Sequence, residues 1–288
     1  MSTNIWNSRT ELLLGEERLA KLNNANVLIV GLGGVGAAAA EMIARSGIGK
    51  VTIVDGDVVE ASNRNRQLGA LISTDGLAKA EAVGARMKDI NADLDLTIVN
   101  KFLEDQEFEI LLKANKFDYV MDCIDTVTPK LYLIMNCLEL GIPLISAMGA
   151  GGKIDPLQVR IANIEDSYNC KLARYVRKRL QTFNAAKGFK VVFSPEEIDK
   201  TRVHVKEGMK NKRSVIGTIS FLPPIFGATC ASVVIRELMG EKVELSPRPA
   251  HIVETEAREK RKAKRDQHKE HVRRAKKKKE EGEQGHGE

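Results

Sequence analysis

The sequence predicts an α/β fold built on a doubly wound, mainly parallel sheet. Five short apolar runs typical of strands alternate with helical patterns through the first half of the chain: residues 27–31, 50–55, 96–100, 119–125 and 143–147. Several of these runs are apolar throughout, as expected when helices cover both faces of a sheet. Alternation of strand and helix favours parallel strands joined by right-handed crossovers.

The helical segments lie between these strands. We expect them near residues 35–46, 77–90, 105–114 and 127–140, with one more near 10–22 before the first strand. The second half is less regular. It contains a strand-like run at 158–164, a basic amphipathic pattern at 172–183, the segment KVVFS and an apolar helix at 223–240. Pro223 and Pro224 stand at the start of this helix, where proline is tolerated.

The charge is unevenly distributed. The net charge is +6, yet residues 1–257 carry 32 residues of each sign, while residues 258–279 hold thirteen basic and three acidic residues. A segment this charged and this poor in apolar side chains cannot bury a core. We therefore expect a folded domain over 1–253 and a disordered basic tail over 254–288, which serves either as a nucleic-acid-binding arm or as a solubilising tail.

The same composition disfavours several classes of protein. The chain has no run of about 18 apolar residues, so we expect no membrane span. Charges interrupt the first 22 residues, where a signal peptide needs an apolar centre, and we expect a cytoplasmic protein. The four cysteines lie far apart without a CxxC pair, so neither a zinc site nor a disulfide framework is expected.

A glycine-rich turn, GLGGVG, follows the first predicted strand. Its glycines are Gly31, Gly33, Gly34 and Gly36. After a strand and before a helix, they permit a tight turn and a close approach of the backbone to phosphate at the helix N-terminus. Asp55, at the end of the second strand, is placed for a ribose hydroxyl. Together these features predict a Rossmann-like nucleotide site rather than a merely structural turn.

The residues that follow favour ATP over a nicotinamide dinucleotide. His204 and His251 are the histidines outside the tail, and neither stands in a recognisable catalytic pattern. Polar residues instead gather after the second strand, where open α/β sheets bind ligands: Asn63, Arg64, Arg66, Gln67 and Lys79. Two arginines and a lysine suit a triphosphate better than a neutral hydride transfer. The alternative is a solvated basic surface.

A second acidic motif, DCID, ends the fourth predicted strand. Asp122 and Asp125 would face the same edge of the sheet as the glycine turn. A carboxylate at this edge is able to hold the Mg²⁺ that bridges ATP phosphates. The alternative is that Asp125 only caps the helix that begins near Thr128.

The chain contains the motifs GxGGxG, D-x-D, N-x-N-R-Q, G-x-x-K and D-C-x-D in this order. In these motifs it resembles the E1-like adenylating superfamily. It includes ubiquitin-activating enzymes and the adenylyltransferases of molybdopterin and thiamine biosynthesis. RTELLLGEERLAKL, ARSGIGKVTIVDGD, NRNRQLGAL, GLAKAEA and GAGGKIDP look most like its tRNA threonylcarbamoyladenosine dehydratases. The resemblance covers about residues 8–240.

The resemblance implies a role for each matching residue. The four glycines would line the phosphates, Asp55 the ribose and Asp125 the metal, while the nucleotide would also contact Asn63, Arg66, Gln67 and Lys79. Arg9 matches an N-terminal arginine that reaches the ATP of the neighbouring subunit, which implies a homodimer. The resemblance also implies a monovalent cation, K⁺ or Na⁺, near ISFLPPIFG, and a sulfur-relay protein as a partner.

The implied substrate is N6-threonylcarbamoyladenosine, beside the anticodon of tRNA. Adenylation would activate its threonyl carboxylate, and a nitrogen of the same side chain would then close a ring with net loss of water. Because this attack is intramolecular, proximity is able to replace a covalent enzyme intermediate. Catalytic roles would fall to Arg66, Lys79, Asp125 and Arg9.

Two departures from the family bear on this prediction. The CxxC pairs that bind zinc in carrier-protein adenylyltransferases are absent, and Val192 in KVVFS stands where related dehydratases commonly have a cysteine. Of the chain's own cysteines, we expect Cys170 alone to be exposed. Two alternatives stay open: an adenylyltransferase of a ubiquitin-like sulfur carrier, and a nucleotide-binding scaffold without catalysis.

Overall fold

The structure is a computed structural model of the chain. It describes residues 5–183, 185, 187–199, 201, 203–205, 214–255, 258 and 265, with the backbone alone at 203–205 and 214–215. The chain divides into two compact units, residues 1–246 and 247–288. The second unit contributes a helical turn over residues 250–255. Most of the tail lies outside the described residues, and the division at residue 253 stays a prediction.

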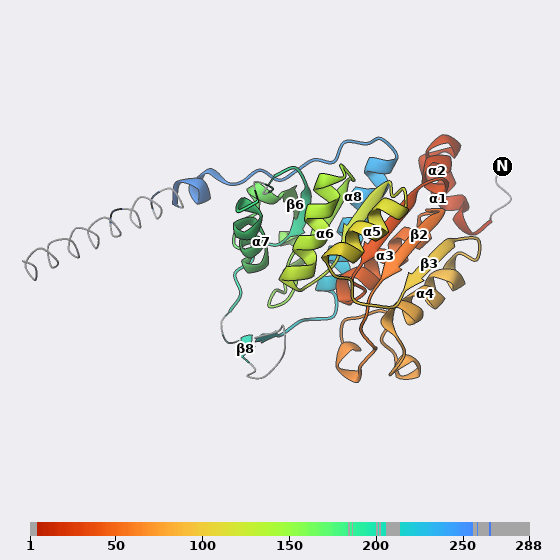
Figure 1. Ribbon diagram of the computed structural model, residues 1–288, viewed down its shortest axis with the longest axis horizontal. Coiled ribbons are helices and arrows are strands. Elements are labelled where there is room, and N and C mark those ends of the chain that lie inside the picture. Colours follow the sequence, from red (N-terminus) through yellow and green to blue (C-terminus); the bar gives the residue numbers. More distant parts are fainter. Residues whose placement is uncertain are drawn as a thin grey trace, which may run out of the picture. The chain divides into compact units, whose positions relative to one another are not determined.

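The first unit is a twisted sheet covered by helices on both faces (Figure 1). The described residues form seven strands in the order β3-β2-β1-β4-β5-β7-β6 and a separate two-stranded sheet of β8 and β9. The strands are β1 (Asn26–Val30), β2 (Lys50–Val54), β3 (Asp95–Val99), β4 (Tyr119–Asp122), β5 (Leu144–Ala147), β6 (Arg160–Asn163), β7 (Lys190–Phe193), β8 (Val203–Val205) and β9 (Ser214–Ile216). The five predicted strands of the first half are confirmed, and all of them pair in parallel.

The helices cover the sheet in two layers, because each central strand is apolar on both faces. Along β1, Val27 and Ile29 belong to one core, while Leu28 and Val30 belong to the other. The helices are α1 (Ser8–Leu14), α2 (Glu16–Asn23), α3 (Gly34–Arg45), α4 (Lys79–Ile90), α5 (Asp105–Ala114), α6 (Val127–Glu139), α7 (Lys171–Gln181) and α8 (Leu222–Leu238). The first core takes its helical residues from α2, α3, α4 and α8, and the second from α5, α6 and α7.

Helix α8 packs closely against α3 at Gly227 and Gly34. A Cβ atom on Gly227 would lie 2.2 Å from the backbone oxygen of Val35, and one on Gly34 would lie 2.9 Å from Cβ of Pro223. The glycines therefore allow the two helices to approach at backbone distance. In this way the last helix of the first unit supports the turn that follows the first strand.

The structure differs from the sequence-based expectation in two places and adds a strand order that the sequence analysis did not predict. The expected N-terminal helix is two helices, α1 and α2, because Gly15 adopts a positive φ of 81° between them. Strand β4 ends at Asp122 rather than at residue 125, since the backbone then turns toward α6. Strand β7 lies between β5 and β6 and pairs antiparallel with β6, an order that local patterns do not specify. No helix in the described parts of the chain is long and apolar enough to cross a membrane.

Candidate active site

The glycine turn leads from β1 into α3 at the carboxyl edge of the sheet. Gly31 has a φ of 87°, a conformation that favours glycine. A Cβ atom on Gly36 would lie 1.7 Å from the backbone oxygen of Gly31, and one on Gly31 would lie 2.9 Å from that of Cys123. With the contact between Gly34 and Pro223, protein packing accounts for three of the four glycines.

Gly33 is different, because neither its backbone conformation nor its neighbours demand glycine. Its φ is −69°, and the one heavy atom within 4 Å of an added Cβ is Nε2 of Gln67, at 3.9 Å. The open space lies at the N-terminus of α3, where the first N–H groups of a helix lack helical partners and attract anions. Helix N-termini commonly bind phosphate groups, and a Cβ atom on Gly33 would fill part of this space.

Asp55 follows β2 and holds the glycine turn in place. Its carboxylate accepts the N–H of Leu32 at 2.5 Å and the N–H of Asp57 at 2.8 Å. Burial raises the pKa of Asp55, and the two backbone hydrogen bonds oppose that rise. Each oxygen has a second lone-pair direction, so the carboxylate is oriented beside the turn and is able to accept a ribose hydroxyl.

Lys79 begins α4 and points back to the end of β2. Its ammonium nitrogen lies 2.8 Å from Oδ2 of Asp57, and its backbone N–H donates to the carbonyl of Asp57. The lysine side chain is 10% exposed, whereas Asp57 is 55% exposed. The ion pair therefore places a nearly buried cation next to the acidic end of β2. Sequence reasoning gave Asp57 no role, although it is the second acid of the D-x-D motif.

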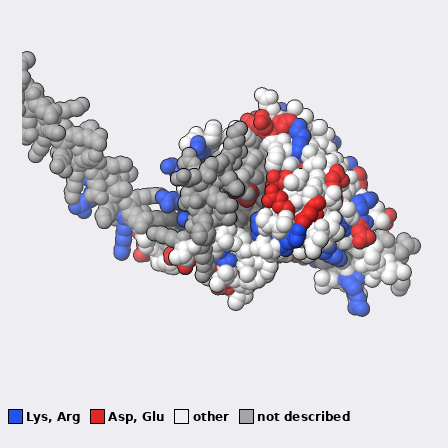
Figure 2. Space-filling model, turned by 90° about the horizontal axis from the view of Figure 1, so that it is seen from below, with Lys and Arg blue, Asp and Glu red and all other residues white. Residues whose placement is uncertain are grey.

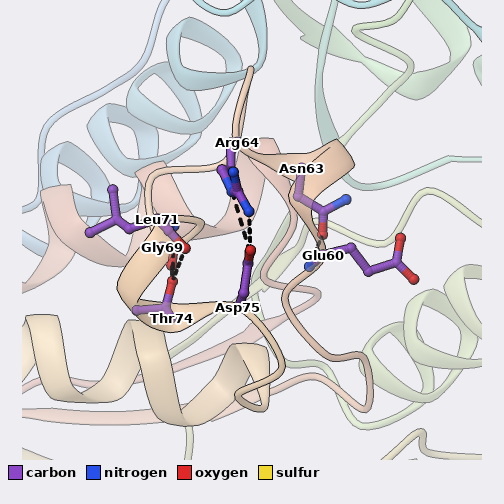
Figure 3. A network of polar contacts seen from close by, with 7 residues as sticks. All are labelled: Glu60, Asn63, Arg64, Gly69, Leu71, Thr74 and Asp75. Atoms are coloured by element: carbon purple, nitrogen blue, oxygen red, sulfur yellow. Dashed lines mark hydrogen bonds and ion pairs between the residues drawn. The ribbon is translucent and has the colours of Figure 1, made fainter.

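An ion pair and hydrogen bonds within the loop stabilise the segment that carries Asn63, Arg66 and Gln67 (Figure 3). Arg64 makes a bidentate ion pair with Asp75 across the loop. Thr74 Oγ1 accepts the N–H of Leu71 and donates to the carbonyl of Gly69, both at 2.8 Å. Asn63 is buried, and its amide oxygen accepts the N–H of Glu60 at 3.2 Å. Arg64 is thus a structural cation, in contrast to its expected place among the phosphate-facing residues.

Arg66 lies on the same loop with polar, uncharged partners. Its Nη1 donates to the carbonyl of Ser62 and to Oδ1 of Asn65, both at 2.9 Å. Among the described residues, no carboxylate pairs with Arg66. Its backbone oxygen lies 2.9 Å from the position of an added Cβ on Gly34, so the residue adjoins the glycine turn. Figure 2 views the molecule from below, toward this edge, and both acidic and basic side chains occur on the described surface there.

The two aspartates of DCID have different surroundings. Asp122 is fully buried and accepts from Nζ of Lys130 at 2.6 Å and from Oγ of Ser146 at 2.5 Å. Lys130 also donates to Ser146 and to the carbonyl of Ala147. Asp122 therefore belongs to a buried network, and Lys130, which sequence reasoning missed, completes it. The helical spacing of an apolar segment gave no sign that a lysine would point inward.

Asp125 lies in the exposed connection between β4 and α6. The N-cap of α6 is Thr126, one residue later, and it makes no side-chain capping hydrogen bond. The backbone of Cys123 contacts Gly31 in the glycine turn. Asp125 comes two residues after Cys123 in the chain. An exposed carboxylate is a ligand type that Mg²⁺ prefers.

Arg9 is not brought to this site within one chain. It is an exposed residue of α1, and the adjoining Asn7 packs near Gly47, beyond the far end of α3. Helix α3 has twelve residues and is therefore about 18 Å long. Figure 1 shows α1 and α2 at the top of the sheet, while the loop after β2 hangs below it. The expected reach of Arg9 to a neighbouring subunit stays a prediction.

None of the four cysteines is exposed. Cys170 is 4% exposed, so the expectation that it is exposed was wrong: its side chain turns into the second core at the start of α7. Burial, with the charge of Asp122, raises the pKa of Cys123 to about 12, and burial also raises the pKa values of Cys137 and Cys230. Val192 is fully buried in β7, so a residue at this position packs in the core.

Sequence reasoning also gave no role to Lys153 in GAGGKIDP. Lys153 is 2% exposed, and its ammonium donates to the backbone oxygen of Ser194 after β7. The neighbouring N–H groups of Ile154 and Asp155 donate to the carboxylate of Glu196 at 3.0 and 2.9 Å. These bonds fasten the loop after β5 to the segment after β7. The signal in the sequence was a lysine among glycines at the end of a predicted strand.

Comparison with known proteins identifies relatives over most of the chain. Residues 7–278 match the ThiF family. The chain is 37% identical to tRNA threonylcarbamoyladenosine dehydratase of Bacillus subtilis over 239 residues, which are 81% of this chain and 94% of the relative. It is similar, at 32% identity and a TM-score of 0.74, to the crystal structure of E. coli tRNA N6-threonylcarbamoyladenosine dehydratase, TcdA, in complex with ATP, and the match covers 83% and 97% of the two chains. Identity to the molybdopterin-synthase adenylyltransferase of E. coli is 35%, over 52% of this chain and 58% of that one.

Proposed function

The chain belongs to the ThiF family, and from this premise we propose that it is an ATP-dependent dehydratase of N6-threonylcarbamoyladenosine in tRNA. The observation that carries the proposal is the extent of the match. The B. subtilis dehydratase aligns over 94% of its length, whereas the molybdopterin-synthase adenylyltransferase aligns over 58%. The dehydratase is therefore matched over nearly its whole length, and the carrier-protein enzyme only in part.

ATP binds across the carboxyl edge at β1, β2 and β4. The open space at Gly33 and the N-terminus of α3 support a phosphate position, and the oriented carboxylate of Asp55 supports a ribose position. Arg66, without a carboxylate partner among the described residues, and Lys79 supply positive charge to the phosphates. Gln67 lies beside Gly33, and the backbone oxygen of the buried Asn63 accepts the N–H groups of Arg66 and Gln67 and so supports this segment.

The metal would be held by Asp125, whose exposed carboxylate suits a hard cation. When bound, Mg²⁺ neutralises charge on the phosphates of ATP. The monovalent cation near residues 219–227 rests on the resemblance alone, and no step of the reaction uses it.

The reaction proceeds in two steps. An oxygen of the threonyl carboxylate attacks the α-phosphorus of ATP, the bond to the β-phosphate oxygen breaks, and pyrophosphate leaves. Arg66 and Lys79 stabilise the charge that develops on the phosphates, an effect of several kcal/mol in comparable sites. A nitrogen of the same threonylcarbamoyl group then attacks the activated carbonyl, loses its proton, and expels AMP.

Ring closure needs no enzyme thiol. Attack within one side chain has an effective molarity on the order of 10⁵ M or more, so a covalent intermediate on the protein is unnecessary. The buried positions of Val192 and Cys170, and the raised pKa of Cys123, agree with this route. The protein's task is to activate the acid, orient it and exclude water.

The active unit would be a homodimer in the cytoplasm, where ATP and tRNA occur together. Arg9 lies about the length of α3 from its own glycine turn, so it is suited to serve a neighbour's site. Helix α1 also exposes Leu12 and Leu13 by 81% and 82%, an apolar surface that a second copy would cover. A sulfur-relay protein is a further partner that the resemblance suggests.

Product analysis separates the candidate functions. Full-length protein with ATP and tRNA that carries N6-threonylcarbamoyladenosine should release AMP and pyrophosphate, and the nucleoside should lose the mass of one water. Release of pyrophosphate with a small protein ending in Gly-Gly, and not with tRNA, would identify a carrier-protein adenylyltransferase. ATP binding without turnover in either mixture would identify a scaffold.

A further inference from the structure

Helix α7 has one buried stripe and one exposed stripe of opposite character. Ala173, Val176 and Leu180 are fully buried in the second core. Lys171, Arg174, Tyr175 and Lys178 are exposed and follow the spacing i, i+3, i+4 and i+7, which places them on one face of a helix. We call these four residues the α7 face. Because the apolar stripe is already covered, this basic amphipathic helix is not available to lie in a membrane.

The α7 face lacks the acidic partners that several other surface cations have. Helix α7 contains no Asp or Glu, and among the described residues no carboxylate pairs with Lys171, Arg174 or Lys178. Several surface lysines elsewhere do pair with acids, as Lys113 does with Glu109 and Lys21 with Glu17. Like charges three or four residues apart destabilise a helix by about 0.2–0.5 kcal/mol per pair. The charge of α7 therefore opposes folding, and an external anion would relieve the repulsion.

Arg177 shows that basic residues of α7 differ in role. Its guanidinium turns inward and donates to the backbone oxygen of Ser167 at 2.7 Å, so it fastens the helix to the turn before it. The three cations of the α7 face make no such bond within the described residues. Tyr175, which lies among them, is 60% exposed. An exposed aromatic ring between cations is the arrangement on which unpaired bases stack next to a phosphate backbone.

The helix begins next to the proposed site. Cβ of Leu172 lies 3.7 Å from the position of an added Cβ on Gly149, two residues beyond β5. Lys171 is therefore at the carboxyl edge. Helix α7 shares the second core with residues of β6 and β7 and lies beside β6 (Figure 1). Strand β7 is three places from β1, or about 14 Å. A structured RNA loop whose modified base enters the site would span that distance.

We propose that the α7 face is the surface on which the substrate RNA docks, with Lys171, Arg174 and Lys178 on its phosphates and Tyr175 against a base. This inference rests on the proposed function for the position of the substrate. It assigns a charged surface of the first unit, which begins beside the carboxyl edge, to RNA binding. The basic tail is not required for it.

The test compares two triple variants of the full-length chain. Lys171→Gln/Arg174→Gln/Lys178→Gln removes the cations of the α7 face. Lys21→Gln/Lys50→Gln/Lys113→Gln removes the same charge from lysines that pair with Glu17, Asp95 and Glu109. The dissociation constant for tRNA that carries N6-threonylcarbamoyladenosine is measured from about 50 to 200 mM salt. Thermal midpoints and ATP affinities report whether each variant is folded.

We expect the first variant to bind tRNA at least 10-fold more weakly than the wild type. Its slope of log K against log salt should be smaller in magnitude by about 2 to 3, because three phosphate contacts are lost. The control variant should stay within twofold with an unchanged slope. Tyr175→Leu should lower the affinity about fivefold or more without changing the slope, since stacking is not ionic. In turnover measurements, the weaker binding should appear as a higher KM for tRNA.

Equal tRNA affinity and slope in the two triple variants would overturn the assignment. Unchanged tRNA binding together with lost binding to vesicles of anionic phospholipid would overturn it in favour of a membrane surface. The proposed function fails separately. If the wild type binds tRNA through these residues but releases no AMP with it, the docking face stands and the reaction is wrong. If turnover depends on tRNA while both variants behave alike, the reaction stands and the docking face is wrong.

Discussion

Two lysine–aspartate pairs lie at the carboxyl edge of the sheet and differ in their contact with solvent. Lys79 and Asp57, after β2, are 2.8 Å apart, and their side chains are 10% and 55% exposed. Lys130 and Asp122, at the end of β4, are 2.6 Å apart and wholly buried. The chemical groups are the same, and the strands that position them are two places apart in the sheet.

The difference shows which pair is structural and which is able to meet a ligand. All three N–H groups of the Lys130 ammonium have acceptors: Asp122, Ser146 and the carbonyl of Ala147. Among the described residues, Lys79 has one side-chain acceptor, Asp57, so two of its N–H groups remain for phosphate oxygens. Lys79, Asp57 and Asp122 all belong to the sequence motifs, but the difference in burial distinguishes the pair that is able to meet a ligand from the structural pair.

The largest expected effect is on folding, through the buried pair. Lys130→Met should lower the free energy of unfolding by about 3–5 kcal/mol, because it leaves Asp122 buried without its cation. Urea unfolding measures the change. Lys79→Met is the control, and it should cost less than about 1 kcal/mol because Asp57 is exposed to solvent. Equal losses in the two variants would contradict the distinction between the pairs.

The next effect is on the reaction, through the pair that meets solvent. Lys79→Ala and Asp125→Ala should each reduce kcat about 10²–10³-fold, since under the proposed function each removes charge that would stabilise the phosphates or their metal. AMP release measures turnover, and the thermal midpoint should change little. Lys101→Ala, a surface lysine paired with Glu107, is the matched control. Near-normal turnover in either variant would remove that residue from the mechanism.

A third cation, Arg9, is proposed to act at the site of a neighbouring subunit. Arg9→Ala and Lys79→Ala proteins should each be inactive, and mixing them should restore about a quarter of the activity, because half of the dimers would be mixed and each would have one intact site. AMP release after mixing measures the recovery. A lack of recovery, with subunit exchange demonstrated by differently tagged chains, would show that the site is not shared.

The smallest effect concerns a third buried lysine. Lys153 is almost as buried as Lys130, but its ammonium donates to a backbone oxygen rather than to a carboxylate. Burial lowers its pKa below 10.5. Between the lowered value and 10.5 the unfolded chain binds more protons, so the free energy of unfolding should rise with pH in this window, by about 1.4 kcal/mol for each unit of the shift. Lys153→Met should remove this rise.

Urea unfolding between about pH 7 and 10 measures the difference between the wild type and Lys153→Met. Lys21→Met, on the surface, is the control and should follow the wild type. If Lys153→Met also follows it, the buried ammonium is not the source of the pH dependence.

The sequence predicts the elements more fully than the contacts between them. Gly31, Gly36 and Asp55 are predictable because a strand, a tight turn and a strand-end acid are local patterns. The roles of Lys130 and Lys153 are not, because each depends on strands distant in sequence. Cys170 was misplaced for the same reason, since its burial results from packing at the start of α7. The position of β7 between β5 and β6 likewise depends on long-range pairing.

The contact between α3 and α8 also bears on how the protein is made. The glycine turn leaves the ribosome early, but α8, which covers Gly34 and Val35, ends at Leu238, about 200 residues later. At about 5–20 residues per second, translation leaves the alanine-rich face of α3 uncovered for about 10 to 40 seconds. The glycine turn is therefore completed by one of the last helices to be synthesised. The nucleotide site proposed at this turn exists only after α8 has packed, so ATP would stabilise the finished domain and not the nascent chain.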